Sequence, residues 1–193
     1  MSGSRRAVRR TVTAAATVLA LTACAPAGPP APAGPAGSAG PAEPAAPAGP
    51  AEPAALGTAA DELPAAGVVL TRPDGSEVAV AVRVAATPDD RARGLMGVTD
   101  LPAGTGMLFV FPALASHGGF WMRGTPIPLD IAFAAAGEVV AVATMTPCAA
   151  DPCPVTHPGR PYDAALEVPA GWLDDVGVGP GARLRVDPVV PAQ

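Results

Sequence analysis

From residue 67 onward, hydrophobic and polar positions alternate in short runs that glycine and proline interrupt. Every second residue from Val78 to Val84 is a valine, with alanine or arginine between. An apolar run, Val68–Leu70, and the turn sequence Pro73-Asp74-Gly75-Ser76 come just before it. This alternation predicts a β-hairpin with one buried face.

Later apolar runs also have the length of strands. They are Met107–Phe111, Phe120–Met122, Leu129–Phe133, Val139–Thr146, Ala164–Val168 and Arg183–Val186. Ala136-Gly137 is placed to turn one run back on its neighbour. Seven or eight short strands with frequent glycine and proline breaks predict a compact, mainly β domain, either a barrel or a sandwich. The order of the strands does not follow from the pattern.

A single short helix is expected after the hairpin. Thr87 can cap it, Pro88 suits its first position, and the two aspartates that follow oppose the positive end of the helix dipole. Gly94 or Gly97 would end it.

Composition separates this domain from what precedes it. The chain has 193 residues with 26 prolines and 22 glycines, and ten of the prolines fall between Pro26 and Pro53. Such a run has little to bury and favours extended polyproline II interrupted by flexible glycine. We therefore expect a disordered Ala/Pro/Gly tether over residues 24–66, a mainly β domain over 67–188 and a short tail over 189–193. A tether of about 42 residues would reach roughly 35 Å as a flexible coil.

The first 23 residues have the features of an export signal. Four arginines lie in the first ten residues, an apolar stretch runs from Val12 to Leu21, and Leu21-Thr22-Ala23-Cys24 follows. Ten residues of helix rise only about 15 Å, half of what a bilayer core requires. The segment resembles a bacterial lipoprotein signal, in which Cys24 would be lipidated and become the mature N-terminus. The alternatives are an ordinary secretory peptide and, from the pair Arg5-Arg6, a twin-arginine route. We expect a protein anchored by lipid on the extracytoplasmic face of the cell membrane.

Charge narrows the range of partners. The formal net charge is −5, and every one of the 12 basic residues is arginine. Without the signal, eight arginines face 17 acids, a net charge of −9. Nucleic acid would repel such a protein, so it is not expected as a partner.

Several motifs between Arg91 and Gly171 occur together in a specific order. They are Arg91-x-x-Gly94-Leu95-Met96, Gly106-Met107-Leu108-Phe109-x-Phe111, Phe120-Trp121-Met122-Arg123-Gly124-Thr125, Leu129-Asp130-Ile131-x-Phe133 and Leu166-Glu167-x-x-Ala170-Gly171. In these motifs the chain closely resembles the prokaryotic family called domain of unknown function 192, from about residue 78 to 186. The resemblance implies a small, mainly β domain, often exported, with no established reaction. The family usually has lysine and asparagine where this chain has Arg123 and Gly124, and arginine where it has Val98.

Four residues within one short stretch could form a ligand site. Trp121, Arg123, Thr125 and Asp130 combine an aromatic face, a cation, a hydroxyl and an acid, which are the groups that bind sugars and other small molecules. Core packing is an equally good explanation for Trp121. Asp130 could be a general base or a ligand anchor, or it could cap backbone amides at a strand end.

Two further residues could take part in catalysis with Asp130. His117 lies in a glycine-containing loop and could transfer protons, or it could be an ordinary surface residue. Glu167 lies between Leu166 and Val168 on an expected strand, and it should face solvent if these two face inward.

The two remaining cysteines, Cys148 and Cys153, are expected to form a disulfide across a four-residue loop, since an exported protein lies in an oxidising environment. No cluster of methionine or histidine supports a metal site, and neither a metal nor a cofactor is expected.

These features favour an extracytoplasmic binding or accessory module that holds an envelope glycan or a small molecule. The alternative is a hydrolase or transferase that acts through Asp130 and His117, with or without Glu167. A purely structural domain is the third possibility.

Overall fold

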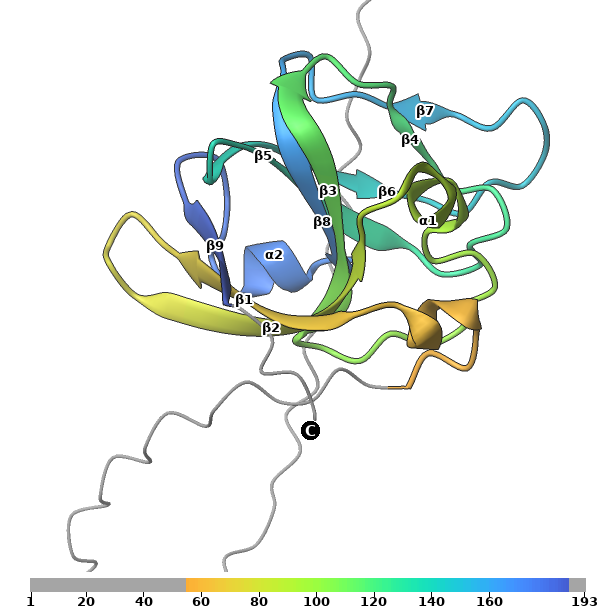
Figure 1. Cartoon of the computed structure of the whole chain (residues 1–193), viewed down its shortest axis with the longest axis horizontal. Helices are drawn as coiled ribbons and strands as arrows, with labels where there is room; N and C mark the ends of the chain where they lie inside the picture. The colour runs from red at the N-terminus through yellow and green to blue at the C-terminus, as the bar shows by residue number, and fades with distance from the viewer. Residues whose placement is uncertain (1–54, 188–193) are drawn as a thin grey trace, which may run out of the picture. The chain divides into compact units, whose positions relative to one another are not determined.

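The computed structural model describes residues 55–187, which form one mainly β unit (Figure 1). The nine strands are β1 (Ala65–Thr71), β2 (Glu77–Ala85), β3 (Thr105–Ala115), β4 (Phe120–Trp121), β5 (Leu129–Ala135), β6 (Glu138–Met145), β7 (Val155–Thr156), β8 (Tyr162–Pro169) and β9 (Arg183–Asp187). The helical elements are the 3-10 turn η1 (Ala59–Glu62) and the helices α1 (Pro88–Arg93) and α2 (Trp172–Asp175). The predictions about the signal over 1–23, Cys24 and the tail over 189–193 lie outside the described residues.

Seven strands close into a barrel in the order β1-β2-β3-β8-β5-β6-β9, and β4 pairs with β7 in a separate two-stranded sheet. The prediction of a mainly β barrel or sandwich is confirmed as a barrel. All neighbours in the barrel are antiparallel except β2 and β3. A parallel pair needs a crossover connection. Residues 86–104 make this connection and carry α1.

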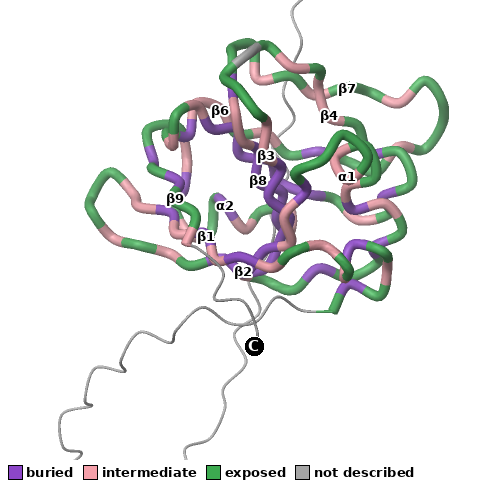
Figure 2. The backbone as a smooth tube through the Cα atoms, in the orientation of Figure 1, coloured by how far each residue is buried: buried purple, intermediate pink, exposed green. Residues whose placement is uncertain are grey.

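Figure 2 shows mostly buried residues along β3 and β8. The sheet around β8 has an apolar core on each of its two faces. In one row across the sheet, Leu166 of β8 lies beside Leu108 of β3 and Ala132 of β5, and all three belong to the core inside the barrel. The next row, which includes Met107 and Ile131, belongs to the outer core. Since side chains alternate along a strand, the central strands are buried on both faces.

The predicted helix is confirmed as α1. Thr87 caps it in a capping box with Asp90, Pro88 occupies the first turn, and Gly94 is the residue at its C-terminal end. A second helix, α2, was not predicted because it has only four residues and begins at Gly171 without a side-chain cap. Its Leu173 belongs to the core inside the barrel. Neither helix within residues 55–187 is long and apolar enough to cross a bilayer.

The folded part begins before residue 67. Thr58 caps η1, and Leu56 and Ala60 are buried in the outer core. The C-terminal end of the segment that we expected to be tether is therefore part of the domain. The Ala/Pro-rich composition gives little sign of this, because residues 55–66 bury only Leu56, Ala60 and Ala66 and pack Leu63 partly against the outer core.

Candidate functional site

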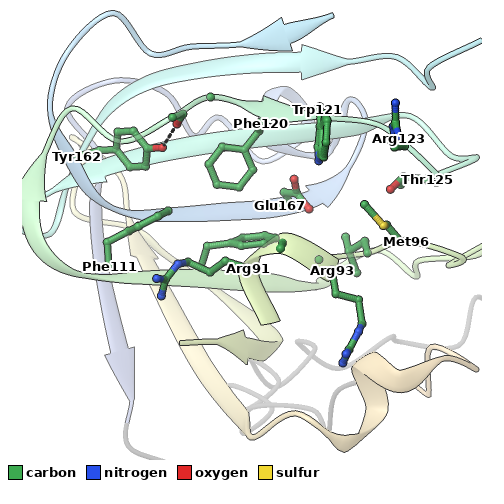
Figure 3. Close-up of a pocket in the computed structure, with 16 residues that line it drawn as sticks. Arg91, Arg93, Met96, Phe111, Phe120, Trp121, Arg123, Thr125, Tyr162 and Glu167 are labelled. Atoms are coloured by element: carbon green, nitrogen blue, oxygen red, sulfur yellow. Dashed lines mark hydrogen bonds between the residues drawn. The ribbon is translucent and has the colours of Figure 1, made fainter. Parts of the chain in front are cut away.

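A cavity of about 230 Å³ opens on the outer side of the barrel. One side of it is formed by residues 91–96, which include the end of α1 and the turn after it. The other sides come from β3, from the segment around β4 and from β8. The crossover between the parallel strands β2 and β3 thus places α1 opposite β4, with the face of β8 between them (Figure 3).

Aromatic side chains are concentrated in this cavity. The chain has only seven aromatic residues, and five of them line it: Phe109, Phe111, Phe120, Trp121 and Tyr162. Several of these rings hold one another edge to face. The centroid of Phe120 lies 4.9 Å from that of Phe109, and the centroid of Phe111 lies 5.2 Å from that of Tyr162. Tyr162 also donates a hydrogen bond to the carbonyl oxygen of Gly118, which fixes its ring. These contacts hold the aromatic side chains of the walls against one another, while arginine, threonine and glutamate side chains add polar groups to the lining.

Trp121 differs from the other four rings because 48% of its surface remains exposed. The core-packing explanation therefore fits Phe120, which packs against the outer core, better than Trp121. Figure 3 shows the indole of Trp121 directed toward Glu167.

Glu167 supplies an acid to the wall of the cavity. Only 4% of its surface is exposed, and it lies in the outer row beside Met107 and Ile131. Burial raises the pKa of Glu167 to about 8, and no neighbouring charge or hydrogen bond offsets this. A carboxyl with such a pKa is mostly protonated at neutral pH, so it can donate a hydrogen bond.

The expectation that Glu167 faces solvent is wrong. Leu166 and Val168 do face into the barrel, as that expectation assumed. The opposite face of β8, which carries Glu167, packs against the outer core and lines the cavity, so it is not exposed to solvent. Alternation along a strand predicts which side chains share a face. It cannot predict that both faces are covered.

Arg91 lies at one end of the cavity, against Phe111. The guanidinium carbon is 4.8 Å from the centroid of that ring. Its Nη1 donates hydrogen bonds to the carbonyl oxygens of Ala86 and Val110, the second over 2.9 Å. These contacts hold the guanidinium in place, and the remaining donors, Nη2 and Nε, have no acceptor within residues 55–187.

Arg123 and Thr125 line the opposite end. The guanidinium of Arg123 lies 5.1 Å from the centroid of Trp121 and forms an ion pair with Asp151. Thr125 is buried, with 6% of its surface exposed. Three of the four predicted ligand-binding residues, Trp121, Arg123 and Thr125, therefore come together around one cavity.

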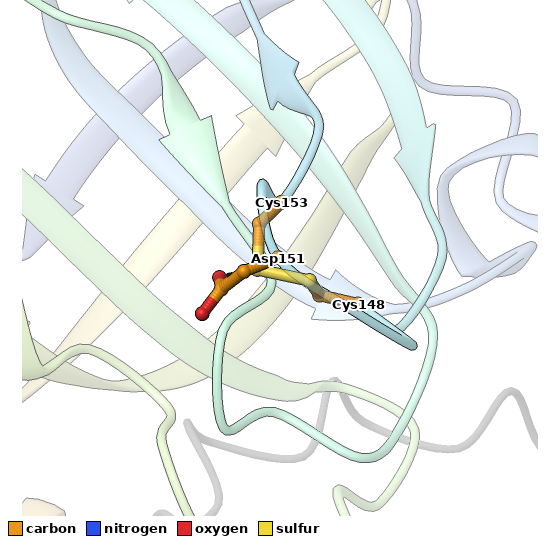
Figure 4. Close-up of side chains that lie close together, drawn as sticks. All are labelled: Cys148, Asp151 and Cys153. Atoms are coloured by element: carbon orange, nitrogen blue, oxygen red, sulfur yellow. Dashed lines mark hydrogen bonds between the residues drawn. A yellow bond between two sulfur atoms is a disulfide. The ribbon is translucent and has the colours of Figure 1, made fainter.

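Asp151 belongs to a loop that the predicted disulfide closes. Cys148 and Cys153 are bonded, with their Cα atoms 5.4 Å apart, so this prediction is confirmed. Figure 4 shows the carboxylate of Asp151 beside the two sulfurs. Sulfurs bonded to each other are not available as thiolate ligands. The loop therefore supports the side chain that pairs with Arg123 and offers no metal site in this form.

Asp130 lies elsewhere. It accepts a hydrogen bond of 2.7 Å from the hydroxyl of Thr144 and one of 3.2 Å from the backbone N–H of Leu173 in α2. Only 4% of its surface is exposed, and it shares no cavity with Trp121 or Arg123. Asp130 was expected to be a general base, a ligand anchor or a cap for backbone amides at a strand end. Its contacts fit the last of these, except that the amide it caps belongs to a helix.

His117 lies behind the aromatic wall and does not line the cavity. Its imidazole stacks on Phe111, with the ring centroids 4.3 Å apart, and its Nε2 lies 2.9 Å from the carbonyl oxygen of Ala113. Asp130 and His117 therefore line no common cavity among the described residues.

Sequence reasoning missed Arg91 and Tyr162 as cavity residues. The position of Arg91 at the start of the first family motif was the available signal.

Comparison with known proteins identifies the family. Residues 69–186 match the family described as "Uncharacterized ACR", which is domain of unknown function 192. The chain belongs to this family. No protein with a curated description matches the chain.

Two solved structures have the same fold. One is a protein described as a proposed transcription regulator from Sinorhizobium meliloti 1021, with 28% identity and a TM-score of 0.59. That match covers 64% of this chain and 95% of the other. The second, a protein of unknown function from Novosphingobium aromaticivorans DSM 12444, has 30% identity and a TM-score of 0.57. It covers 72% of this chain and 94% of the other.

The structure accounts for two positions at which this member of domain of unknown function 192 departs from the family pattern. Gly124 has a φ of 68°, a backbone conformation that glycine and asparagine adopt most readily. Replacing the usual asparagine by glycine therefore preserves the turn after Arg123. Val98 is fully buried in the outer core, so this position brings no polar group to the cavity.

Proposed function

We propose that this domain is a ligand-binding module of the cell envelope, anchored by lipid at Cys24, and that the cavity between α1, β4 and β8 holds one sugar unit of an envelope glycan. The observation that carries the proposal is the cavity itself. It gathers five of the chain's seven aromatic side chains around Glu167, a buried acid that has no ion-pair or hydrogen-bond partner within residues 55–187.

This combination suits a sugar ring. Aromatic faces bind the C–H faces of a sugar, and a buried polar group with free hydrogen-bonding capacity binds its hydroxyl or amide groups. A volume of about 230 Å³ lies below the usual range of about 300 to 1,000 Å³ for small-molecule pockets, so the cavity has room for one ring or a group of similar size and not for a longer ligand.

The alternative of a hydrolase or transferase finds less support. Asp130 is engaged with Thr144 and Leu173, and His117, which stacks on Phe111, lines no cavity in common with it, so this arrangement does not favour joint acid-base catalysis. The name of the Sinorhizobium meliloti structure does not extend to this chain either. Residues 55–187 contain eight arginines and 15 acids, a balance that opposes binding to nucleic acid.

The two tryptophans permit a direct test. Trp172 belongs to α2 and packs against the core inside the barrel, away from the cavity. The variant Trp172→Phe therefore leaves Trp121 as the only tryptophan. We expect N-acetylglucosamine, or the disaccharide repeat of the cell wall, to change its fluorescence in a saturable way.

The matched control is Trp121→Phe, which retains Trp172 and should give no change with either sugar. If neither sugar changes the fluorescence of Trp121 and calorimetry detects no heat of binding, the proposal is wrong.

A further inference from the structure

We infer that the cavity selects an acidic sugar, whose carboxylate binds the guanidinium of Arg91. This inference rests on the proposed function and goes beyond it, because it names the charge of the ligand. It is carried by the arrangement of charged groups around the cavity, taken together with the unused donors of Arg91.

The charges that line the cavity are almost all positive. Arg91 and Arg93 come from the end of α1, Arg123 from the turn after β4, and Tyr162 and Glu167 from β8, while β3 adds no ionisable group. Glu167 and Tyr162 are both in environments that favour their neutral forms, because burial raises the pKa of each. Beyond the lining, the ionisable neighbours within residues 55–187 include Asp151, paired with Arg123, His117, which stacks on Phe111, and His157, whose ring lies against Gly119 of the lining.

The three arginines are not equivalent. Arg123 is neutralised by Asp151, and Figure 3 shows the side chain of Arg93 directed away from Glu167 and that of Arg91 extended toward Phe111 at the end of the cavity. Arg91 is only partly buried, and two backbone carbonyls and the ring of Phe111 hold it in place. Carbonyl oxygens carry no full charge, so its positive charge is uncompensated within residues 55–187.

A guanidinium has five N–H donors in a planar fork that matches a carboxylate. Arg91 uses Nη1 for the two carbonyls, which leaves Nη2 and Nε for a ligand. Because these contacts already fix its position, little side-chain entropy is lost when an anion binds. A neutral Glu167 at the other side of the same cavity does not repel that anion and can donate a hydrogen bond to the ring.

Two pairs of sugars test the inference with the full-length protein. N-acetylmuramic acid is N-acetylglucosamine with a lactic acid group that carries a carboxylate, and glucuronic acid is glucose with a carboxylate at C6. At pH 6.5 we expect each acidic sugar to bind about tenfold more tightly than its neutral counterpart, since a hydrogen bond to a charged group contributes that much. Comparison of the two pairs shows whether the lactic acid group or the uronic acid position is preferred.

Arg91→Lys should reduce the acidic-to-neutral affinity ratio severalfold, because lysine keeps the charge without the fork. Arg160→Gln is the control: Arg160 is exposed, does not line this cavity, and its loss should leave the ratio unchanged. Partial unfolding would weaken both sugars of a pair together, so the ratio separates recognition from folding.

Raising the pH through about 8 should weaken the acidic sugars and affect the neutral ones little, because ionised Glu167 adds a second negative charge to the cavity. Glu167→Gln should remove this pH dependence. The inference fails if both members of each pair bind equally, or if affinity for the acidic sugars rises with pH. If neither acidic nor neutral sugars bind, the proposed function fails.

Discussion

Glu167 should make the stability of this protein fall as the pH rises. Its carboxyl is buried and has no charged or hydrogen-bonded partner within residues 55–187, so burial raises its pKa from 4.5 to about 8 in the folded state. Between these two pH values the unfolded chain loses the proton and the folded chain keeps it. The folded state then binds more protons than the unfolded state, and the free energy of unfolding decreases as the pH increases.

The size of the effect follows from the width of this window. Each pH unit costs about 1.4 kcal/mol, so the contribution of Glu167 falls by up to about 5 kcal/mol between pH 4.5 and pH 8 and is constant outside this range. Other acids act at lower pH. The pKa of Asp61 is lowered by the backbone N–H of Leu56 and that of Asp74 by the side chain of Ser76, so the stability that they add is lost only as the pH falls below about 4.

Urea denaturation of the wild type and of Glu167→Gln at one-unit steps from pH 5 to pH 9 isolates the effect. Glu167→Gln cannot ionise at this position. Its unfolding free energy should therefore increase relative to that of the wild type by about 1.4 kcal/mol per pH unit up to pH 8, and the difference should then stay constant. Glu138→Gln, at an exposed glutamate of β6, serves as the control and should follow the wild type. If the unfolding free energies of the wild type and Glu167→Gln run parallel over this pH range, Glu167 does not have a raised pKa in the folded protein.

Three other predictions concern the anchor and the fold. Cys24→Ala should move the protein from the membrane fraction to the soluble fraction of a cell extract, and continued membrane association would contradict lipidation. Asp130→Ala should lower the free energy of unfolding by about 2 to 3 kcal/mol, because it removes two buried hydrogen bonds, and should leave sugar affinity unchanged. A loss of affinity in a folded Asp130→Ala protein would restore a functional role for this residue. Gly106→Ala should lower the free energy of unfolding by about 3 kcal/mol, because the added Cβ would lie 2.2 Å from the backbone oxygen of Glu167. A Cβ added at Gly179 would meet no atom within 4 Å, so Gly179→Ala should change the stability little. Equal denaturation midpoints for the two alanine variants would contradict the close packing of β3 on β8.

Local signals in the sequence predicted local structure well. Thr87 and Pro88 predicted α1, and the alternating valines from Val78 to Val84 predicted a strand. Both signals depend only on residues that are close in the sequence. The closure of the barrel did not follow from such signals. It depends on the pairing of β1 with β9 and of β2 with β3, and these contacts join distant segments.

The difference between local signals and long-range contacts also explains which site residues could be predicted from the sequence. Trp121, Arg123 and Thr125 lie within five residues of one another, so their chemistry was visible in one motif, and the structure places them around one cavity. Asp130 continues that motif, but it lies on a strand whose alternation turns it into the row of Val168, inside the barrel. Glu167 lies in the outer row, and only the arrangement of α1 and β4 over that row makes it a cavity residue.

Binding of a ligand in this cavity can be observed at the two indole N–H signals in a ¹⁵N–¹H NMR spectrum. One signal belongs to Trp121, at the cavity, and the other to Trp172, in α2. Addition of N-acetylmuramic acid should move the Trp121 signal progressively to saturation and leave the Trp172 signal in place. If the Trp121 signal stays in place at every concentration of this sugar and of N-acetylglucosamine, the cavity does not bind these sugars and the proposed function is wrong.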